Sequence, residues 1–171
     1  RELGALWAHS FECAMASVLL ARHPGLVTSE SAFLAGLLHD IGKPLMVQAL
    51  GDKYLEAFSR DANSPEKEEE LFGGSHAESG AWFAERCKLP VDCVMAIRHH
   101  HAPSGYMKET TRDPALVRIA YLANIMATGC KEALESQECE ETLKALSLSP
   151  EDYEKLTLEF SELKGSAPSF T

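Results

Sequence analysis

The stretch LLHDIGKPLM, residues 37–46, sets a histidine, an aspartate and a lysine directly after an apolar run. The apolar run is suited to a protein core, whereas His39, Asp40 and Lys43 are polar and ionisable. Ionisable groups beside a buried segment are costly unless they are paired or hold a cation. This stretch is therefore the first candidate for a functional site.

Outward from this stretch the apolar residues keep helical spacing, and no segment alternates as a half-buried strand does. In the first segment they are Leu3, Leu6, Trp7, Phe11, Ala14, Met15, Val18 and Leu19. The pattern predicts an all-α bundle of about eight to nine helices. They are expected near residues 2–22, 30–39, 44–60, 65–72, 75–88, 90–100, 114–128, 131–146 and 150–164.

Local signals mark the ends of these helices. Ser64-Pro65, Asp113-Pro114 and Ser149-Pro150 each offer an N-cap residue followed by proline at the first helical position. Glycine and proline clusters predict breaks at residues 23–25, 72–74, 102–105 and 128–130.

The chain has 171 residues, of which 45% are hydrophobic, so it can bury one core of ordinary size. We expect one helical domain over residues 1–164 and a flexible tail over 165–171, which reads GSAPSFT. Because the sequence does not begin with methionine, we expect it to be part of a longer protein.

The charge of the chain argues against polyanionic partners. Its 16 basic and 26 acidic residues give a net charge of −10, so we expect neither DNA nor a membrane surface as a partner. No stretch approaches the ~18 uninterrupted apolar residues of a membrane span. The acidic run Glu66 to Glu70, which includes Lys67, is expected to be a solvated helix face.

The five cysteines are odd in number and form no C-x-x-C pair. This pattern argues against a disulfide framework and against a zinc site made only of thiolates. A reducing, cytoplasmic location fits the pattern best.

Histidines gather at expected helix ends and beside apolar stripes. They are His9, His39, His76 and the run His99, His100 and His101, whereas His23 looks like a loop residue. Imidazole and carboxylate are the ligands of zinc, iron and manganese ions, so a metal site is one interpretation. The alternative is a helical scaffold in which the histidines only pack.

Five segments in this order carry a family resemblance: HS, LLHDIGK, SHAESGAWF, LPVDCVMAIRHHH and LVRIAYLAN. Together they resemble the HD superfamily of metal-dependent phosphohydrolases, and most closely its HDOD branch, the HD-related output domains of bacterial signalling proteins. The resemblance spans roughly residues 5–160 and implies an HD-domain-like helical bundle. HDOD domains usually carry a further helical portion before the segment that resembles LWAHS, which again suggests a fragment.

The resemblance also implies a ligand set for one or two divalent metal ions, with Fe, Mn, Zn, Ni or Mg as candidates. The first metal maps to His9, His39, Asp40 and Asn124, and a second adds His76 and His99, with His100 as a further candidate. Asp40 could bridge two cations through its two carboxylate oxygens and so take a catalytic role. Lys43 resembles the phosphate-facing lysine of the family, or is a solvated surface residue.

Three departures from the family pattern bear on activity. Asn124 stands where catalytic members carry an aspartate, so this ligand brings no negative charge. Relatives that cleave cyclic dinucleotides carry a glutamate after the paired histidines and a Gly-Tyr-Pro sequence, whereas this chain has His101 and SGYM. Ala5 stands where some of them have a glutamate ligand. These differences argue against hydrolysis of cyclic-di-GMP in particular.

Two function classes therefore stay open. The first is a metal-dependent phosphohydrolase or phosphodiesterase that acts on a nucleotide or another phosphate-containing small molecule. The second is a non-catalytic HDOD regulatory module that binds a signalling protein partner or a nucleotide. Similarity of fold does not separate the two.

Overall fold

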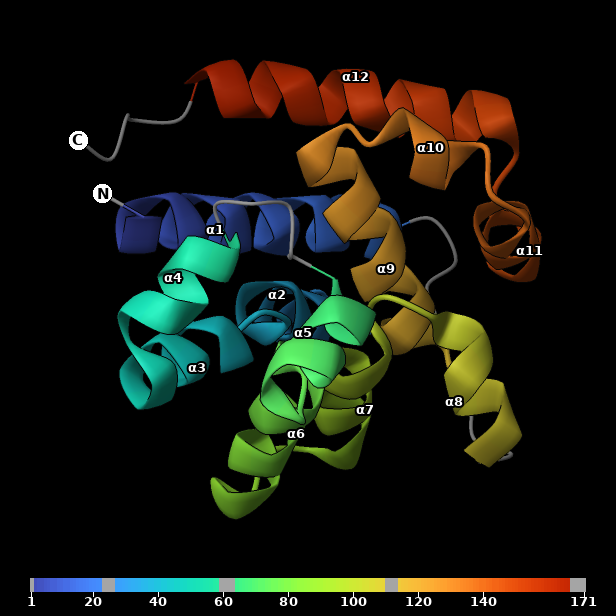
Figure 1. The fold of residues 1–171 in the computed structure, drawn as a ribbon. Helices are drawn as coiled ribbons and strands as arrows, with labels where there is room; N and C mark the ends of the chain where they lie inside the picture. Colours follow the sequence, from blue (N-terminus) through green and yellow to red (C-terminus); the bar gives the residue numbers. More distant parts are fainter. Residues whose placement is uncertain (1, 23–26, 59–63, 110–113, 167–171) are drawn as a thin grey trace.

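The computed structural model describes residues 2–22, 27–58, 64–109 and 114–166, and this part of the chain is helical and holds no strand (Figure 1). The helices are α1 (Glu2–Ala21), α2 (Ser29–Leu38), α3 (Gly42–Leu50), α4 (Asp52–Phe58), α5 (Pro65–Phe72), α6 (His76–Arg86), α7 (Val91–His99), α8 (Pro103–Glu109), α9 (Ala115–Thr128), α10 (Lys131–Leu134), α11 (Gln137–Ala145) and α12 (Pro150–Ser166). The all-α prediction is confirmed.

Two of the predicted helices are each divided in the structure. The segment expected over 44–60 forms α3 and α4, because Gly51 ends α3 with a φ of 59°. The segment expected over 131–146 forms α10 and α11, because the Ser136 side chain accepts a hydrogen bond from the Cys139 amide and caps a new helix. The break expected at 102–105 lies earlier, at residues 100–102, since α7 ends at His99 and α8 begins at Pro103.

The predicted helix starts are confirmed where the structure describes them. Ser64 accepts a hydrogen bond from the Lys67 amide, and Ser149 accepts one from the Asp152 amide. The cap expected at Asp113 and the break over 23–25 lie outside the described residues. α12 continues to Ser166, and the rest of the expected tail, residues 167–171, also lies outside them.

The core consists of two groups of buried apolar residues, and α2 contacts both. The larger group lies among α1, α2, α9, α11 and α12, and the smaller lies between α6 and α7. Ala32 and Ala35 of α2 belong to the larger group, whereas Leu34 and Leu38 pack against the smaller one. Because α2 is held on both sides, its C-terminal end is a rigid support for the residues that follow.

The helix α1 is both long and apolar. Its segment Gly4–Ala21 has a mean hydropathy of 1.2 over 18 residues, so by length and composition it passes the test for a membrane span. His9, Ser10 and Glu12 interrupt its apolar residues, so the expectation that no uninterrupted apolar run reaches this length is not contradicted. α1 packs against α2, α9 and α12, and Figure 1 shows α12 running beside it, so its apolar residues also suit a helix in the core of a bundle.

Two glycines allow the close approach of the helices that frame the site. A Cβ added at Gly36 of α2 would lie 2.5 Å from the backbone oxygen of Cys13 and 2.8 Å from the Cα of Ala14, both in α1. A Cβ at Gly42 would overlap the backbone of His76 and lie 2.8 Å from the Gly80 nitrogen, both in α6. Glycine at these positions therefore brings the turn at residues 39–41 against α1 and α6 at once.

Candidate metal centre

Asp40 lies at the turn between α2 and α3, and one of its carboxylate oxygens, Oδ1, faces histidines from α6 and the end of α7. His76 Nε2 is 3.3 Å and His100 Nε2 is 3.5 Å from Oδ1. His101 Nε2 lies 2.9 Å from His76 Nε2. One donor atom from each of these four side chains lies within 4.8 Å of the other three. We call this set the Oδ1 group.

The other carboxylate oxygen, Oδ2, faces α1, α2 and α3. His39 Nε2 is 3.4 Å and His9 Nε2 is 3.7 Å from this oxygen. The Sγ of Cys13 lies 3.5 Å from His9 Nε2. Donor atoms of His9, Cys13 and His39 all lie within 4.8 Å of one another, and we call these three residues the Oδ2 group. Lys43 Nζ lies 2.6 Å from the same oxygen and forms a buried ion pair with it.

Backbone carbonyls orient two of the imidazole rings. His39 Nδ1 lies 2.8 Å from the Gly36 carbonyl oxygen, and His100 Nδ1 lies 2.7 Å from that of Ile97. A carbonyl only accepts, so each Nδ1 carries the hydrogen and donates it. Each Nε2 therefore points toward Asp40 with its lone pair available as a metal ligand in the neutral ring.

A buried carboxylate orients the third ring, that of His76. Glu68 Oε2 lies 2.6 Å from His76 Nδ1 and accepts a further bond from the His76 backbone amide at 2.7 Å. The Tyr54 hydroxyl donates to the other oxygen of the same carboxylate. Glu68 is 1% exposed, so the expectation of a wholly solvated run from Glu66 to Glu70 is wrong at this residue. The carboxylate is buried because three donors satisfy it.

Burial and neighbouring charge set the protonation of the two anionic candidates. Burial alone would raise the pKa of Asp40, but the charges of His39 and Lys43 outweigh it and hold that pKa well below its usual value. Burial also opposes ionisation of Cys13, yet the charge of His39 and the contact with His9 leave the pKa of this thiol lowered. Both shifts thus act toward the anionic form that metal binding requires.

The imidazoles differ in their affinity for protons. Burial lowers the pKa of His100 to about 4 and also lowers that of His101, on which the charges of His100 and His76 act in the same direction. Burial would also lower the pKa of His39, but the charge of Asp40 outweighs this effect and raises that pKa to about 10. A cation that binds His39 must therefore displace a proton.

Two buried atoms test whether the residues fit a metal ion. His39 Nε2 and Asp40 Oδ1 have no hydrogen-bond partner, although both side chains are buried. A buried polar atom without a partner costs about 1–3 kcal/mol. One atom faces each group, and imidazole, carboxylate and thiolate are established ligands of divalent transition metals. The donor set therefore fits one or two such ions.

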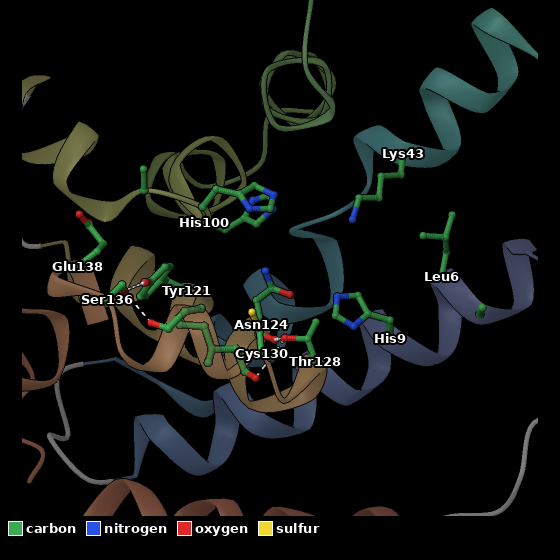
Figure 2. Close-up of a pocket in the computed structure, with 15 residues that line it drawn as sticks. Leu6, His9, Lys43, His100, Tyr121, Asn124, Thr128, Cys130, Ser136 and Glu138 are labelled. Atoms are coloured by element: carbon green, nitrogen blue, oxygen red, sulfur yellow. Dashed lines mark hydrogen bonds between the residues drawn. The ribbon is translucent and has the colours of Figure 1, made fainter. Parts of the chain in front are cut away.

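A cavity of about 780 Å³ adjoins both groups. His9 and Lys43 line one part of it and His100 another, and Figure 2 shows their side chains directed toward the space between them. The far wall includes Tyr121 and Ser136, whose hydroxyl oxygens are 3.3 Å apart. A small molecule in this cavity would therefore contact His9, Lys43, His100 and His101.

The structure brings together most of the residues singled out from the sequence. His9, His39, Asp40, His76 and His100 form the centre, and Lys43 reaches it. Asn124 lines the cavity, and its role as a ligand stays a prediction (Figure 2).

His99 is not brought into either group of possible ligands found among the described residues. Its ring lies against Tyr106, with the centroids 5.7 Å apart, because His99 is the last residue of α7 and faces α8. The chain turns after it, and His101 takes the position near His76 instead.

Sequence reasoning missed His101, Cys13 and Glu68. His101 belongs to a run of three histidines, and Cys13 follows His9 by one helical turn, so both carried a local signal. Glu68 carried none, because it stands in an acidic run and pairs with a residue eight positions away.

The model of the HDOD domain family matches residues 1–103 of the chain. No curated protein sequence matches. The solved structures that share the fold include three at 20–24% identity, and each of these is larger than this chain.

The first is a candidate phosphohydrolase from Shewanella amazonensis, at a TM-score of 0.71 and 24% identity, and the match covers 96% of this chain and 61% of that one. An HDOD domain protein of unknown function from Geobacter sulfurreducens matches with a TM-score of 0.73 and 22% identity, over 95% of this chain and 61% of that one. A candidate signal transduction protein from Marinobacter aquaeolei matches with a TM-score of 0.78 and 20% identity, over 94% of this chain and 37% of that one. With the family model matching over more than half of its length, the chain belongs to the HDOD domain family.

Proposed function

We propose that this HDOD domain binds divalent metal at Asp40 and hydrolyses a phosphate ester held in the adjoining cavity, as a metal-dependent phosphohydrolase of the phosphodiesterase type. The observation that carries the proposal is the meeting of the Asp40, His76, His100 and His101 donors within 4.8 Å, beside a cavity of about 780 Å³. A divalent cation at such a site supplies Lewis-acid polarisation of a phosphoryl oxygen and activation of a water molecule.

The residues of the chain have distinct parts in this proposal. Asp40 presents one oxygen to each group and so would be the ligand shared by two cations. Lys43 lines the cavity, so its ammonium is placed to attract a phosphate oxygen once a cation shares the Asp40 carboxylate. The local positive charge is needed because the chain as a whole carries a net charge of −10.

The cavity favours a substrate of nucleotide size. Ligand sites of small molecules commonly occupy about 300–1,000 Å³, and about 780 Å³ lies within this range. Tyr121 and Ser136 offer hydroxyl groups on the wall away from the phosphate, and Ile125 offers an apolar surface. These groups suit the sugar and base of a nucleotide better than inorganic phosphate alone.

A second candidate is a regulatory module without catalysis, which binds a signalling protein or a nucleotide. The ion pair of Lys43 with Asp40 favours it, since an ammonium already neutralises Oδ2, one of the two oxygens through which Asp40 would be shared by two cations. The neutral amide of Asn124 adds no compensating charge. A related fold described as a signal transduction protein supports the same candidate.

The test is elemental analysis of protein purified without a histidine tag, followed by assays on nucleotide phosphodiesters with Mn²⁺ or Fe²⁺. We expect bound metal in the wild type and its loss in Asp40→Asn, with the exposed Asp52→Asn as the matched control. Metal together with turnover supports the hydrolase. Metal without turnover on any nucleotide leaves the regulatory module, and no metal in the wild type contradicts both parts of the main proposal.

We also infer that residues 1–164 act as one HDOD domain in the cytoplasm. Its five free cysteines agree with a reducing compartment. The solved relatives extend well beyond the region that this chain matches, so partners bound elsewhere in such proteins are a separate question.

A further inference from the structure

Cys13 lies one helical turn after His9 on α1 and is 1% exposed. Its Sγ is 3.5 Å from His9 Nε2. In a tetrahedral zinc site with Zn–S of ~2.3 Å and Zn–N of ~2.0–2.1 Å, the sulfur and the nitrogen are also about 3.5 Å apart. The separation of these two donors therefore matches one edge of a tetrahedral metal site.

His39 supplies an independent observation that points to a ligand. Its Nε2 is buried and has no hydrogen-bond partner, while its Nδ1 is engaged by the Gly36 carbonyl. This Nε2 lies 3.4 Å from Asp40 Oδ2, which is again close to the separation of two ligand atoms on one tetrahedral ion. The orphaned nitrogen thus faces the space that Cys13 and His9 border.

The backbone holds these donors in place before any ion binds. α1 and α2 approach so closely at Gly36 that a Cβ there would collide with the Cys13 carbonyl. Cys13 and His39 are carried by elements packed at this contact, so their separation does not depend on a flexible loop. His9 is 21% exposed and lines the cavity, which leaves one side of the position open.

We propose that Cys13, His9 and His39 ligate a second cation through one sulfur and two nitrogens, and that the thiolate makes this position select zinc over magnesium or manganese. The inference rests on the proposed metal-binding function and names the metal class of the Oδ2 group. Binding forms one sulfur–metal bond and two nitrogen–metal bonds, and the S–H proton of Cys13 and the Nε2 proton of His39 leave to solvent. Thiolate is a soft ligand, which disfavours the hard cations.

The charge around the Oδ2 group explains the need for a thiolate. Lys43 already places a positive charge 2.6 Å from Asp40 Oδ2, which weakens the attraction of that carboxylate for a cation. Asn124, on the cavity wall, is neutral. Cys13 is then the residue among the three ligands that can supply a negative charge to the ion.

The experiment uses Co²⁺ as a spectroscopic probe, because a cobalt–thiolate bond gives an intense charge-transfer absorption in the near ultraviolet that nitrogen and oxygen ligands do not give. We expect the band in untagged wild-type protein loaded with Co²⁺. Cys13→Ser should lose the band and bind Zn²⁺ about 100-fold more weakly at one of two positions, an effect at the upper end of those reported for changes around metal ligands. Cys139→Ser, which replaces a fully buried cysteine in the larger core group, is the matched control and should keep the band.

The outcomes separate this inference from the function on which it rests. Wild-type protein that binds Co²⁺ without the band overturns the role of Cys13 and leaves the metal-binding function standing. Protein that binds no metal overturns both. The wild-type spectrum decides the matter even if Cys13→Ser does not fold, and a band that survives in folded Cys13→Ser or Cys13→Ala contradicts the assignment.

Discussion

The two sides of the Asp40 carboxylate differ in nearly every property that matters for a metal ion. The Oδ1 group contains three imidazoles, and His76 and His100 are fully buried. The Oδ2 group contains the thiol of Cys13 and the partly exposed His9, and the ammonium of Lys43 lies against Asp40 Oδ2. A single carboxylate thus faces a set of imidazoles on one side and a set with a thiol and an ammonium on the other, so occupancy by one ion need not imply occupancy by two.

The groups that orient the histidine rings also differ between the Oδ1 group and the Oδ2 group. Behind the Oδ1 group, Glu68 holds His76 through a charged hydrogen bond and is itself held by Tyr54. Behind the Oδ2 group, a backbone carbonyl holds His39. A carboxylate raises the basicity of an imidazole ligand more than a carbonyl does. We therefore expect the Oδ1 group to bind its ion more tightly.

Removing the charge of Asp40 should abolish the difference between the two sides. Asp40→Asn keeps the shape of the side chain but loses the anion that both groups share, so we expect metal affinity to fall by more than ~100-fold at both positions. Isothermal titration with Zn²⁺ and Mn²⁺ measures this. Retention of either ion at wild-type affinity would show that Asp40 is not the shared ligand.

Substitution of neighbouring histidines should separate His101 from His99. His101→Gln removes a donor of the Oδ1 group, and we expect a loss of metal affinity of about 100-fold. His99→Gln is the matched control and should change the affinity by less than about 2-fold, because its ring lies against Tyr106 outside both groups. Equal effects of the two variants would contradict the geometry of the α7 end.

Glu68 should act only on the Oδ1 side. Glu68→Gln keeps the volume of the side chain but weakens its hold on His76, so we expect a loss of about 10–100-fold in the affinity of that position for metal. The cobalt–thiolate absorption of the other position should persist. The exposed neighbour Glu69→Gln serves as the control. An equal loss at both positions would indicate general destabilisation, which circular dichroism on heating would reveal.

The smallest expected change is a gain at the cavity wall. Asn124→Asp adds a charge with almost unchanged shape, and we expect metal affinity to rise by about 10-fold, with greater turnover of a phosphodiester if the domain is a hydrolase. Asn124→Ala should not raise affinity. Tighter metal binding without turnover on nucleotide substrates would favour the regulatory module, and no change in affinity would place Asn124 outside the ligand shell.

Much of the helical architecture can be predicted from the sequence, because local interactions determine where helices begin. The side chains of Ser64 and Ser149 cap α5 and α12 through bonds to amides three residues ahead, so both helix starts were predictable. The apolar run before His39 predicts a core helix that ends at the site. Gly51, by contrast, divides a predicted helix, since one glycine inside an apolar pattern does not reveal a positive φ.

The sequence by itself determined the all-helical fold through the spacing of its apolar residues, and its resemblance to the HD superfamily identified Asp40, His39, His9, His76 and His100 as candidates. Tertiary structure alone decided which of three consecutive histidines would face the site: successive residues at a helix end point in directions about 100° apart, so the choice depends on where α7 stops. It also decided the role of Glu68. A carboxylate in an acidic run is normally solvated, and this one is buried only because Tyr54 and His76, distant in sequence, meet it with donors.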